Sequence, residues 1–158
     1  MSSNKLPQLK VDSVLSLFSS QQFSDALDVI DLLTVDYPED ELLFNIKGAC
    51  YAGLEQFDDA IKSYERALLI NPKYAKAYFN LGGALHELGQ LDDATINYKK
   101  SLDINPSFAE AQNNLGNVYK ELGQLDKAID SYQKALAINP KYAEAHFSIV
   151  ITFQLLDE

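Results

Sequence analysis

Two consecutive stretches decide the fold of this chain. Residues 75–108 read AKAYFNLGGALHELGQLDDATINYKKSLDINPSF, and residues 109–142 read AEAQNNLGNVYKELGQLDKAIDSYQKALAINPKY. When the two are aligned at an offset of 34 residues, eighteen positions are identical. Self-similarity at a fixed period of this length is the signature of repeat architectures, in which each unit stacks on its neighbours to bury a continuous core. We therefore expect an array of units.

The repeat register extends in both directions from this pair. The unit before it keeps the strongest markers, which are Gly48, Ala60, Tyr64, Ala67 and Pro72. The first unit keeps only Ala26 and Pro38 of these, and Ile30 stands where the later units have tyrosine. We predict a disordered segment over residues 1–6 and a single solenoid over residues 7–158. Its parts are a degenerate repeat at 7–40, full repeats at 41–74, 75–108 and 109–142, and a terminal helix or truncated fifth repeat at 143–158.

Each unit has a helical period. In the third unit, Ala77, Leu81 and Leu85 recur every four residues and form one apolar face. Gly89 interrupts this face, and a second apolar stripe runs until Pro106, where the helix ends because the residue before a proline avoids the α conformation. Each unit is therefore predicted to be a helical hairpin, and the sequence has no strand signal. The expected fold class is all-α.

A glycine recurs in the middle of the first helix of each central unit. These glycines are Gly48, Gly82 and Gly116. Glycine in a helix interior costs about 1 kcal/mol relative to alanine. A cost repeated at one register indicates a repeated benefit, most simply a close approach of the partner helix. We expect the contact to be completed by the facing alanines, which are Ala60, Ala94 and Ala128.

These markers resemble the signature of the tetratricopeptide repeat. The matching residues of the third unit are Gly82, Leu85, Ala94, Tyr98 and Pro106. The resemblance implies an α–α superhelix, a solenoid of stacked antiparallel helical hairpins, in which the first helix of each hairpin lines a concave surface. It also implies a protein–protein interaction scaffold that binds an extended peptide or partner segment in this concave groove and has no catalytic activity of its own.

Composition and charge narrow the classes of partner. The chain has 158 residues, 47% of them hydrophobic, and 23 acidic residues outnumber 13 basic ones to give a formal net charge of −10. Such a surface repels nucleic acids and anionic membranes, so we expect neither as a partner. No apolar run is long enough to span a membrane, and the N-terminus lacks the apolar core of a secretory signal. Because Cys50 is the single cysteine, a reducing cytoplasm is the expected compartment.

Polar side chains that lie off the apolar face of the first helices also recur at helical spacing. Several are asparagines, whose amide group both donates and accepts hydrogen bonds and can therefore pair with a peptide backbone. We predict that these side chains form the peptide-binding part of the concave surface. The predicted set is Asn45, Lys76, Phe79, Asn80, His86, Glu110, Asn113, Asn114, Asn117 and Lys120.

Residues 109–120 resemble the superhelical repeats of O-linked N-acetylglucosamine transferase, in which an inner ladder of asparagines holds extended substrate chains. The resemblance implies that Asn80 and Asn114 are ladder positions. Two other interpretations stay open. The asparagines are also acceptable consensus residues on a solvated helix face. A clamp for a C-terminal carboxylate would need several converging basic residues, and only Lys76 and Lys120 qualify.

Enzymatic and metal-binding interpretations have little support. His86 and His146 lack the spacing of a metal pair, and the chain has no metalloprotease motif, glycine-rich phosphate loop or nucleophile elbow. Carboxylate pairs such as Asp92-Asp93 fall where helices begin, and a favourable interaction with the helix dipole explains them. We expect no enzyme activity, no metal and no cofactor.

The last segment, HFSIVITFQLL at residues 146–156, is apolar nearly all round. Solenoids normally close with a helix whose outer face is polar, so an apolar end predicts association. We predict a homo-oligomer formed through residues 143–158, with contacts from Phe147, Ile151, Phe153 and Leu155. The alternatives are the front portion of a longer array, a non-catalytic targeting or substrate-recruiting arm of a larger glycosyltransferase- or sulfotransferase-like enzyme, and a self-assembling structural scaffold.

Overall fold

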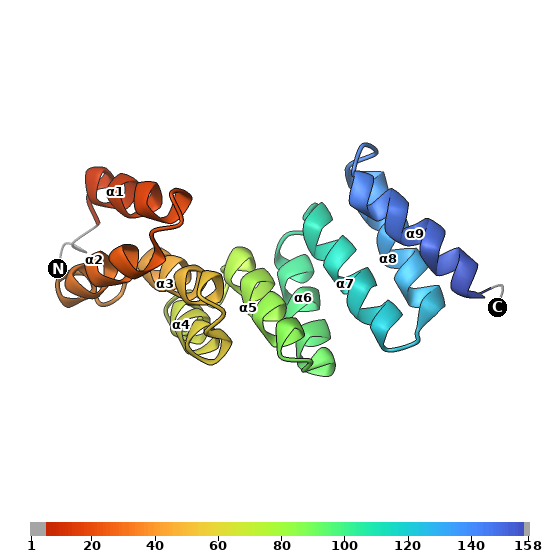
Figure 1. The fold of residues 1–158 in the computed structure, drawn as a ribbon, viewed down its shortest axis with the longest axis horizontal. Helices are drawn as coiled ribbons and strands as arrows, with labels where there is room; N and C mark the ends of the chain where they lie inside the picture. Colours follow the sequence, from red (N-terminus) through yellow and green to blue (C-terminus); the bar gives the residue numbers. More distant parts are fainter. Residues whose placement is uncertain (1–5, 157–158) are drawn as a thin grey trace.

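The computed structural model describes residues 6–156, which form nine α-helices and no β-strand (Figure 1). The helices are α1 (Gln8–Ser19), α2 (Phe23–Asp36), α3 (Glu41–Gly53), α4 (Phe57–Ile70), α5 (Ala75–Glu87), α6 (Leu91–Ile104), α7 (Ala109–Glu121), α8 (Leu125–Ile138) and α9 (Ala143–Leu156). Helices α1 to α8 pair into four hairpins, and α9 packs on the last of them. None of these described helices is long and apolar enough to cross a membrane. The predicted all-α fold is confirmed.

Inside each hairpin, a residue in the left-handed conformation turns the chain. Gly89 and Gly123 have φ angles of 72° and 71°, and Gln21 and Glu55 adopt the same conformation with φ of 57° and 59°. Glycine adopts this conformation without strain, whereas a residue with a Cβ atom pays roughly 1–2 kcal/mol. The second helix of each hairpin begins two residues after this turn.

Between hairpins, the recurrent Ile-Asn-Pro tripeptide builds the connection. The Oδ1 atoms of Asn71, Asn105 and Asn139 each accept a hydrogen bond from the backbone N–H two residues further on, over 3.1, 3.2 and 3.2 Å. This is an Asx turn, which offers the backbone an alternative to helix. Together with the following proline, it ends the second helix at the same register in the last three hairpins.

The recurrent glycines lie against tyrosine rings of the facing helix. A Cβ atom added at Gly48, Gly82 or Gly116 would lie 2.5, 2.9 or 2.5 Å from the nearest ring atom. The rings belong to Tyr64, Tyr98 and Tyr132, which are all buried. The predicted close approach of the two helices is confirmed. The residue in closest contact with each glycine is a tyrosine, however, and not the facing alanine that we expected.

The first hairpin has a different pair at the same register. Val14 stands at the glycine position and Ile30 at the tyrosine position, and both are 0% exposed. They belong to an N-terminal apolar cluster that α1, α2 and α3 share, which is separate from the main core of the central hairpins. Cys50 is buried in this cluster, where it occupies the place of a small apolar residue.

The predicted N-terminal boundary needs one correction. Of the segment 1–6 that we expected to be disordered, residues 1–5 lie outside the described residues, but Leu6 is buried in the N-terminal cluster. Its apolar side chain leaves water by packing on α1–α2, which is favourable. The packed part of the chain therefore includes residue 6.

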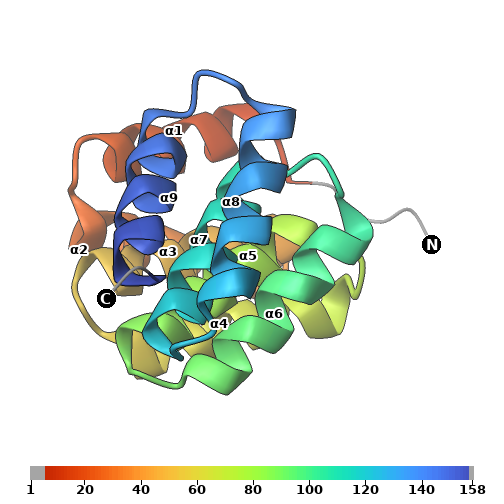
Figure 2. The ribbon, with the colours of Figure 1, turned by 90° about the vertical axis from the view of Figure 1, so that its right-hand side faces the viewer.

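The array curves because its two kinds of helix pack differently. Successive first helices contact each other, α3 with α5, α5 with α7 and α7 with α9. Within residues 6–156 no comparable contact joins successive second helices, such as α4 with α6 or α6 with α8. The first helices therefore lie on the inside of the curve and the second helices on the outside (Figure 1). The end-on view shows the superhelical path that results (Figure 2).

Candidate peptide-binding groove

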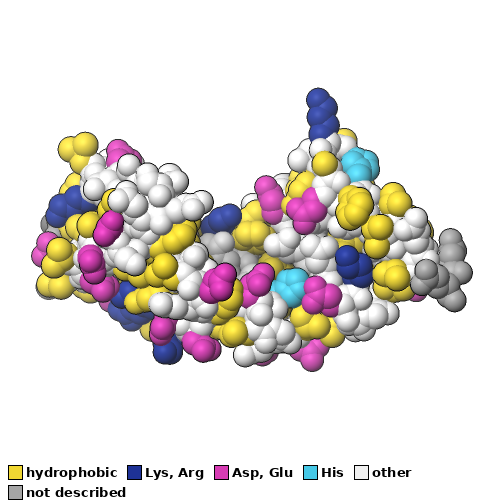
Figure 3. Space-filling view, viewed as in Figure 1, with side chains coloured by type: hydrophobic (Ala, Val, Ile, Leu, Met, Phe, Trp, Pro, Cys, Tyr) yellow, Lys and Arg dark blue, Asp and Glu magenta, His cyan; other side chains and the backbone are white. Residues whose placement is uncertain are grey.

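The inner surface of the curve is formed by α3, α5 and α7. In the view of Figure 3, the upper edge of the molecule is hollowed between the α1–α2 hairpin on the left and the α7–α9 end on the right. Acidic, basic and apolar side chains all occur on this face. The residues that we predicted for peptide binding come from these three helices, at corresponding positions of the 34-residue register.

Two of the predicted asparagines bind each other. Asn80 on α5 donates a hydrogen bond from Nδ2 to Oδ1 of Asn45 on α3, over 3.0 Å. Asn45 is buried, and Asn80 is half-buried. The bond gives the buried Asn45 carbonyl the partner that it requires and joins two successive first helices. It does not engage the Asn80 carbonyl oxygen, which can still accept a hydrogen bond from a peptide N–H.

Asn113 occupies the position equivalent to Asn45 two repeats later, and it is fully buried. Its Nδ2 donates to Oε1 of Glu144 on α9, over 2.9 Å. Its Oδ1 is buried and has no hydrogen-bond partner among the described residues. The amide orientation follows from the acceptor that it meets, because a carboxylate can only accept. Asn113 therefore holds α7 against α9 from beneath the groove surface.

The remaining two predicted asparagines, Asn114 and Asn117, contact tyrosines that pack between the two helices of a hairpin. Asn114 Nδ2 lies 3.5 Å from the Tyr98 hydroxyl, and the Tyr132 hydroxyl donates to Asn117 Oδ1 over 2.7 Å. Burial raises the pKa of Tyr98 and of Tyr132 to about 12, and the contact with Asn114 partly opposes this rise at Tyr98. Both hydroxyl groups therefore stay protonated at neutral pH.

An aromatic platform, formed by Phe79 and Phe108, lies between α5 and the start of α7. The centroids of the two rings are 4.6 Å apart, and the Tyr98 ring is 5.9 Å from Phe79. The Lys76 ammonium lies 4.7 Å from the Phe79 centroid and 5.3 Å from that of Phe108. Both phenylalanines are half-buried, so their exposed parts can stack with an apolar or cationic side chain.

Phe108 is absent from the set predicted from the sequence. It precedes the first residue of α7 and follows Pro106 in the connection between hairpins. Its position on a helix face is therefore not evident from the helical period. The available signal is the aromatic residue at the same register in the neighbouring connections, Tyr74 and Tyr142.

The charged residues of the predicted set are spread along the groove. His86 Nε2 lies 2.8 Å from Glu121 Oε1, which links α5 to α7. Glu110 is exposed and Lys120 is half-buried, and neither takes part in an ion pair within residues 6–156. Lys76 is held over the platform. The same residues contain no group of three or more His, Cys, Asp or Glu side chains placed to hold a metal ion.

Helix α9 exposes the apolar side chains that we predicted for self-association. Phe147 is 69%, Phe153 47% and Leu155 44% exposed, and Ile151 is half-buried. Val150, at the glycine register, is also exposed, because no further described helix covers this face of α9. The apolar surface therefore has two sides, one that continues the groove and one that would face a second helix.

Known repeat families match most of this array. The profile described as "Tetratricopeptide repeat" matches residues 109–142, and the one described as "TPR repeat" matches residues 49–89 and 83–123. A curated relative, the peroxisomal targeting signal receptor of Kluyveromyces lactis, is 30% identical over 82 residues, which are 49% of this chain and 14% of the receptor. The chain thus spans a small part of the receptor's length.

Solved structures share the fold beyond the matched repeats. A crystal structure of MamA superposes with a TM-score of 0.82 at 25% identity, covering 88% of this chain and 81% of MamA. The first TPR of Spaghetti (RPAP3) bound to the HSP90 peptide SRMEEVD superposes with a TM-score of 0.73 at 23% identity, covering 75% of this chain and 94% of that one.

Repeat profile, hairpin geometry and fold therefore agree over residues 49–142. Proteins of this class act as protein–protein interaction scaffolds. The chain belongs to the tetratricopeptide repeat family.

Proposed function

We propose that this protein is an interaction scaffold that holds an extended peptide of a partner across the inner faces of α5 and α7. The observation that carries the proposal is the juxtaposition of the Phe79–Phe108 platform with two half-buried amides, Asn80 and Asn114. An aromatic surface gives a ligand side chain apolar contact, and the amides serve the ligand backbone. The RPAP3 repeat, which has the same fold, was solved with a bound peptide.

The chemistry of the groove favours one class of peptide. Glu110 is exposed beside the platform helices, and Glu87 is exposed at the end of α5. The Lys76 ammonium rests on the aromatic rings. A peptide that presents an apolar side chain to the platform and basic side chains to the two glutamates would meet complementary groups, in keeping with the net charge of −10. We place this binding in a reducing cytoplasm, which suits the buried thiol of Cys50.

A double substitution tests the proposal. Peptides selected from a random-sequence display library on the unaltered protein would be compared for affinity with the variant N80A/N114A. We expect an affinity loss of about tenfold or more, on the scale of about 1 kcal/mol for each neutral hydrogen bond removed. Asn80→Ala also removes the partner of the buried Asn45 carbonyl, so the variant should lose about 1–3 kcal/mol of stability, and binding is compared at a temperature at which both proteins are folded. Asn97→Ala, on the outer helix α6, is the control and should keep the affinity. Equal affinity in the double variant would contradict the role of the amides.

Self-association is a second candidate function, favoured by the exposure of Phe147 and Phe153 on α9. A second copy would remove this apolar surface from water. Sedimentation velocity would compare the unaltered chain with Phe153→Ser, and with Leu32→Ser on α2 as a control that removes an apolar side chain of greater exposure. We expect an oligomer that Phe153→Ser dissociates and Leu32→Ser does not. A chain that stays monomeric at high concentration would contradict this candidate.

A further inference from the structure

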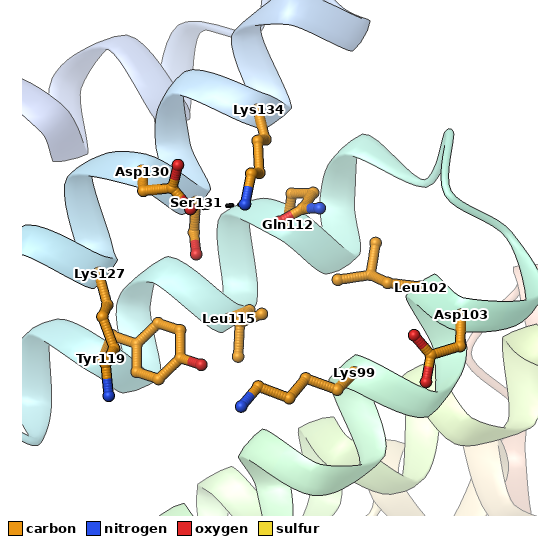
Figure 4. Close-up of a pocket in the computed structure, with 10 residues that line it drawn as sticks. All are labelled: Lys99, Leu102, Asp103, Gln112, Leu115, Tyr119, Lys127, Asp130, Ser131 and Lys134. Carbon is orange, nitrogen blue, oxygen red and sulfur yellow. Dashed lines mark hydrogen bonds and ion pairs between the residues drawn. The ribbon is translucent and has the colours of Figure 1, made fainter.

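A second groove lies on the outer side of the solenoid, between α6 and α8, with α7 as its floor. It opens there because successive second helices do not pack closely on each other. Its volume is about 330 Å³. Figure 4 shows Lys99 of α6 and Lys127 and Lys134 of α8 around it, with Gln112, Leu115 and Tyr119 of α7 between them. We call this site the α6–α8 groove.

Positive charge in the α6–α8 groove gathers around one tyrosine. The ammonium groups of Lys99 and Lys127 lie 5.7 and 5.6 Å from the centroid of the same Tyr119 ring. Lys134 is paired with Asp130 over 2.6 Å, but within residues 6–156 neither Lys99 nor Lys127 forms an ion pair. Two like charges on one ring repel each other, and an anion that enters this part of the groove would be attracted by both.

The repeat itself does not require these lysines. One repeat earlier, the groove between α4 and α6 has the same construction, with a volume of about 710 Å³. At the positions equivalent to Lys99 and Lys127, it carries Glu65 and Asp93. The charge is therefore reversed at two matched positions, and Leu85 stands where the α6–α8 groove has Tyr119. A packing role of these positions cannot explain the reversal, because all four side chains are exposed.

We propose that the α6–α8 groove binds an acidic segment of a partner protein. A glutamate or aspartate side chain of the segment would lie beside the Tyr119 ring, where both ammonium groups attract it, and would form a charge-assisted hydrogen bond with one of them. A neighbouring apolar side chain of the segment would pack on Leu102 and Leu115, which line the same groove. The site faces away from the inner groove, so the scaffold holds two different segments at once.

The charge of the whole molecule makes this site selective for a short acidic segment. The groove also holds Asp103, and the chain as a whole carries a net charge of −10. A long anion such as a nucleic acid would meet repulsion beyond the groove. A peptide in which acidic and apolar residues alternate places few negative charges outside it.

Two adjacent lysines on α6 provide a matched test. The probe is a short, terminally blocked peptide of alternating glutamate and leucine, titrated into the full chain and followed by calorimetry and by the amide resonances of α7. Lys99→Glu should weaken binding by about tenfold or more, because it replaces an attraction by a repulsion. Lys127→Asp, which restores the residue type of the preceding groove, should do the same. Lys100→Glu makes the same change of net charge but lies in the α4–α6 groove, and it should change the affinity by less than about twofold.

Three outcomes would overturn the proposal. Equal losses in Lys99→Glu and Lys100→Glu would show that net charge alone is responsible. Tighter binding of single-stranded oligouridylate than of the peptide would assign the groove to nucleic acid. Self-association of the unaltered chain that Lys99→Glu abolishes would identify a second copy as the occupant. All of these lysines are exposed, so the variants are expected to fold, which circular dichroism would check.

Discussion

In every hairpin two helices pack together, but the residues at their contact differ in shape between the first hairpin and the central hairpins. In the central hairpins, a glycine of the first helix receives a tyrosine ring of the second. In the first hairpin, Val14 occupies the position of those glycines, and Ile30 occupies the position of those tyrosines. Both pairs are buried, but α1 and α2 approach each other less closely than the two helices of a central hairpin. A glycine is therefore needed where the helices approach closely around a large ring, and a β-branched residue fits where they lie further apart.

The tyrosines of the central hairpins carry a hydroxyl group, which the isoleucine of the first hairpin lacks. The hydroxyl groups of Tyr98 and Tyr132 contact Asn114 and Asn117 on the inner surface. These two tyrosines therefore connect the core to the groove. Ile30 has no polar group with which to make such a connection. The third and fourth hairpins therefore combine packing with groove chemistry, whereas the first hairpin provides packing only.

The largest effect of a single group is expected when the valine of the first hairpin is placed at the glycine position of a central hairpin. Gly82→Val should destabilise the protein by about 3 kcal/mol, because even its Cβ atom would lie 2.9 Å from the Tyr98 ring. Urea denaturation would measure the loss. Gly83→Ala, one residue further on, is the control, since its Cβ atom would meet only the Tyr98 hydroxyl at 3.7 Å. Equal losses for the two variants would contradict the proposed contact.

Alkaline pH should weaken the central hairpins next. Tyr98 and Tyr132 have pKa values raised by burial from 10.0 to about 12, so the folded chain keeps protons that the unfolded chain releases in this window. The stabilisation is complete below pH 10 and is lost as the pH rises towards 12, by about 2 kcal/mol for each tyrosine. Urea denaturation across this range would show the loss. Tyr98→Phe should remove its share of the dependence, and an unchanged dependence in that variant would contradict the assignment.

A somewhat smaller effect is expected from a compensating change. In G82V/Y98I, the central hairpin acquires the pair of the first hairpin, so about 1–2 kcal/mol of the loss in Gly82→Val should be recovered. A thermodynamic cycle with the single variant Tyr98→Ile would measure the coupling. Additive losses would show that the side chains at positions 82 and 98 do not compensate for each other in volume. Peptide binding should still be weakened, because the hydroxyl beside Asn114 is lost.

The sequence predicts the hairpins well because their determinants are local. The helical period, the left-handed glycines and the Ile-Asn-Pro connection each act within a few residues, and they recur at a fixed offset. The partner of the repeated glycine was harder to predict. A small residue opposite a small residue is the simple expectation, but the ring that fills the space comes from a side chain one turn away from Ala94.

The groove was less predictable for a physical reason. Asn45 and Asn113 have the spacing of groove residues, yet they are buried by contacts from the neighbouring repeats, Asn80 and Glu144. Helical spacing within one repeat does not contain that information. The α6–α8 groove likewise joins Lys99 and Lys127 from two different repeats. Only the three-dimensional arrangement shows that these lysines share one ring.

The smallest effect is expected at the turns, where the first and second halves of the chain also differ. Gln21 and Glu55 hold the left-handed conformation in the first two hairpins, and Gly89 and Gly123 hold it in the next two. Gly123→Ala should cost about 1 kcal/mol, because nothing lies near its Cβ position and only the backbone conformation is strained. Glu55→Gly should change stability by less than about 0.5 kcal/mol, since the relief of strain is offset by the greater freedom of glycine in the unfolded chain. Thermal denaturation of both variants would check the pair. A larger loss in Glu55→Gly than in Gly123→Ala would mean that the first turns are held by side-chain contacts, and the difference between the two halves would then be one of packing and not of backbone conformation.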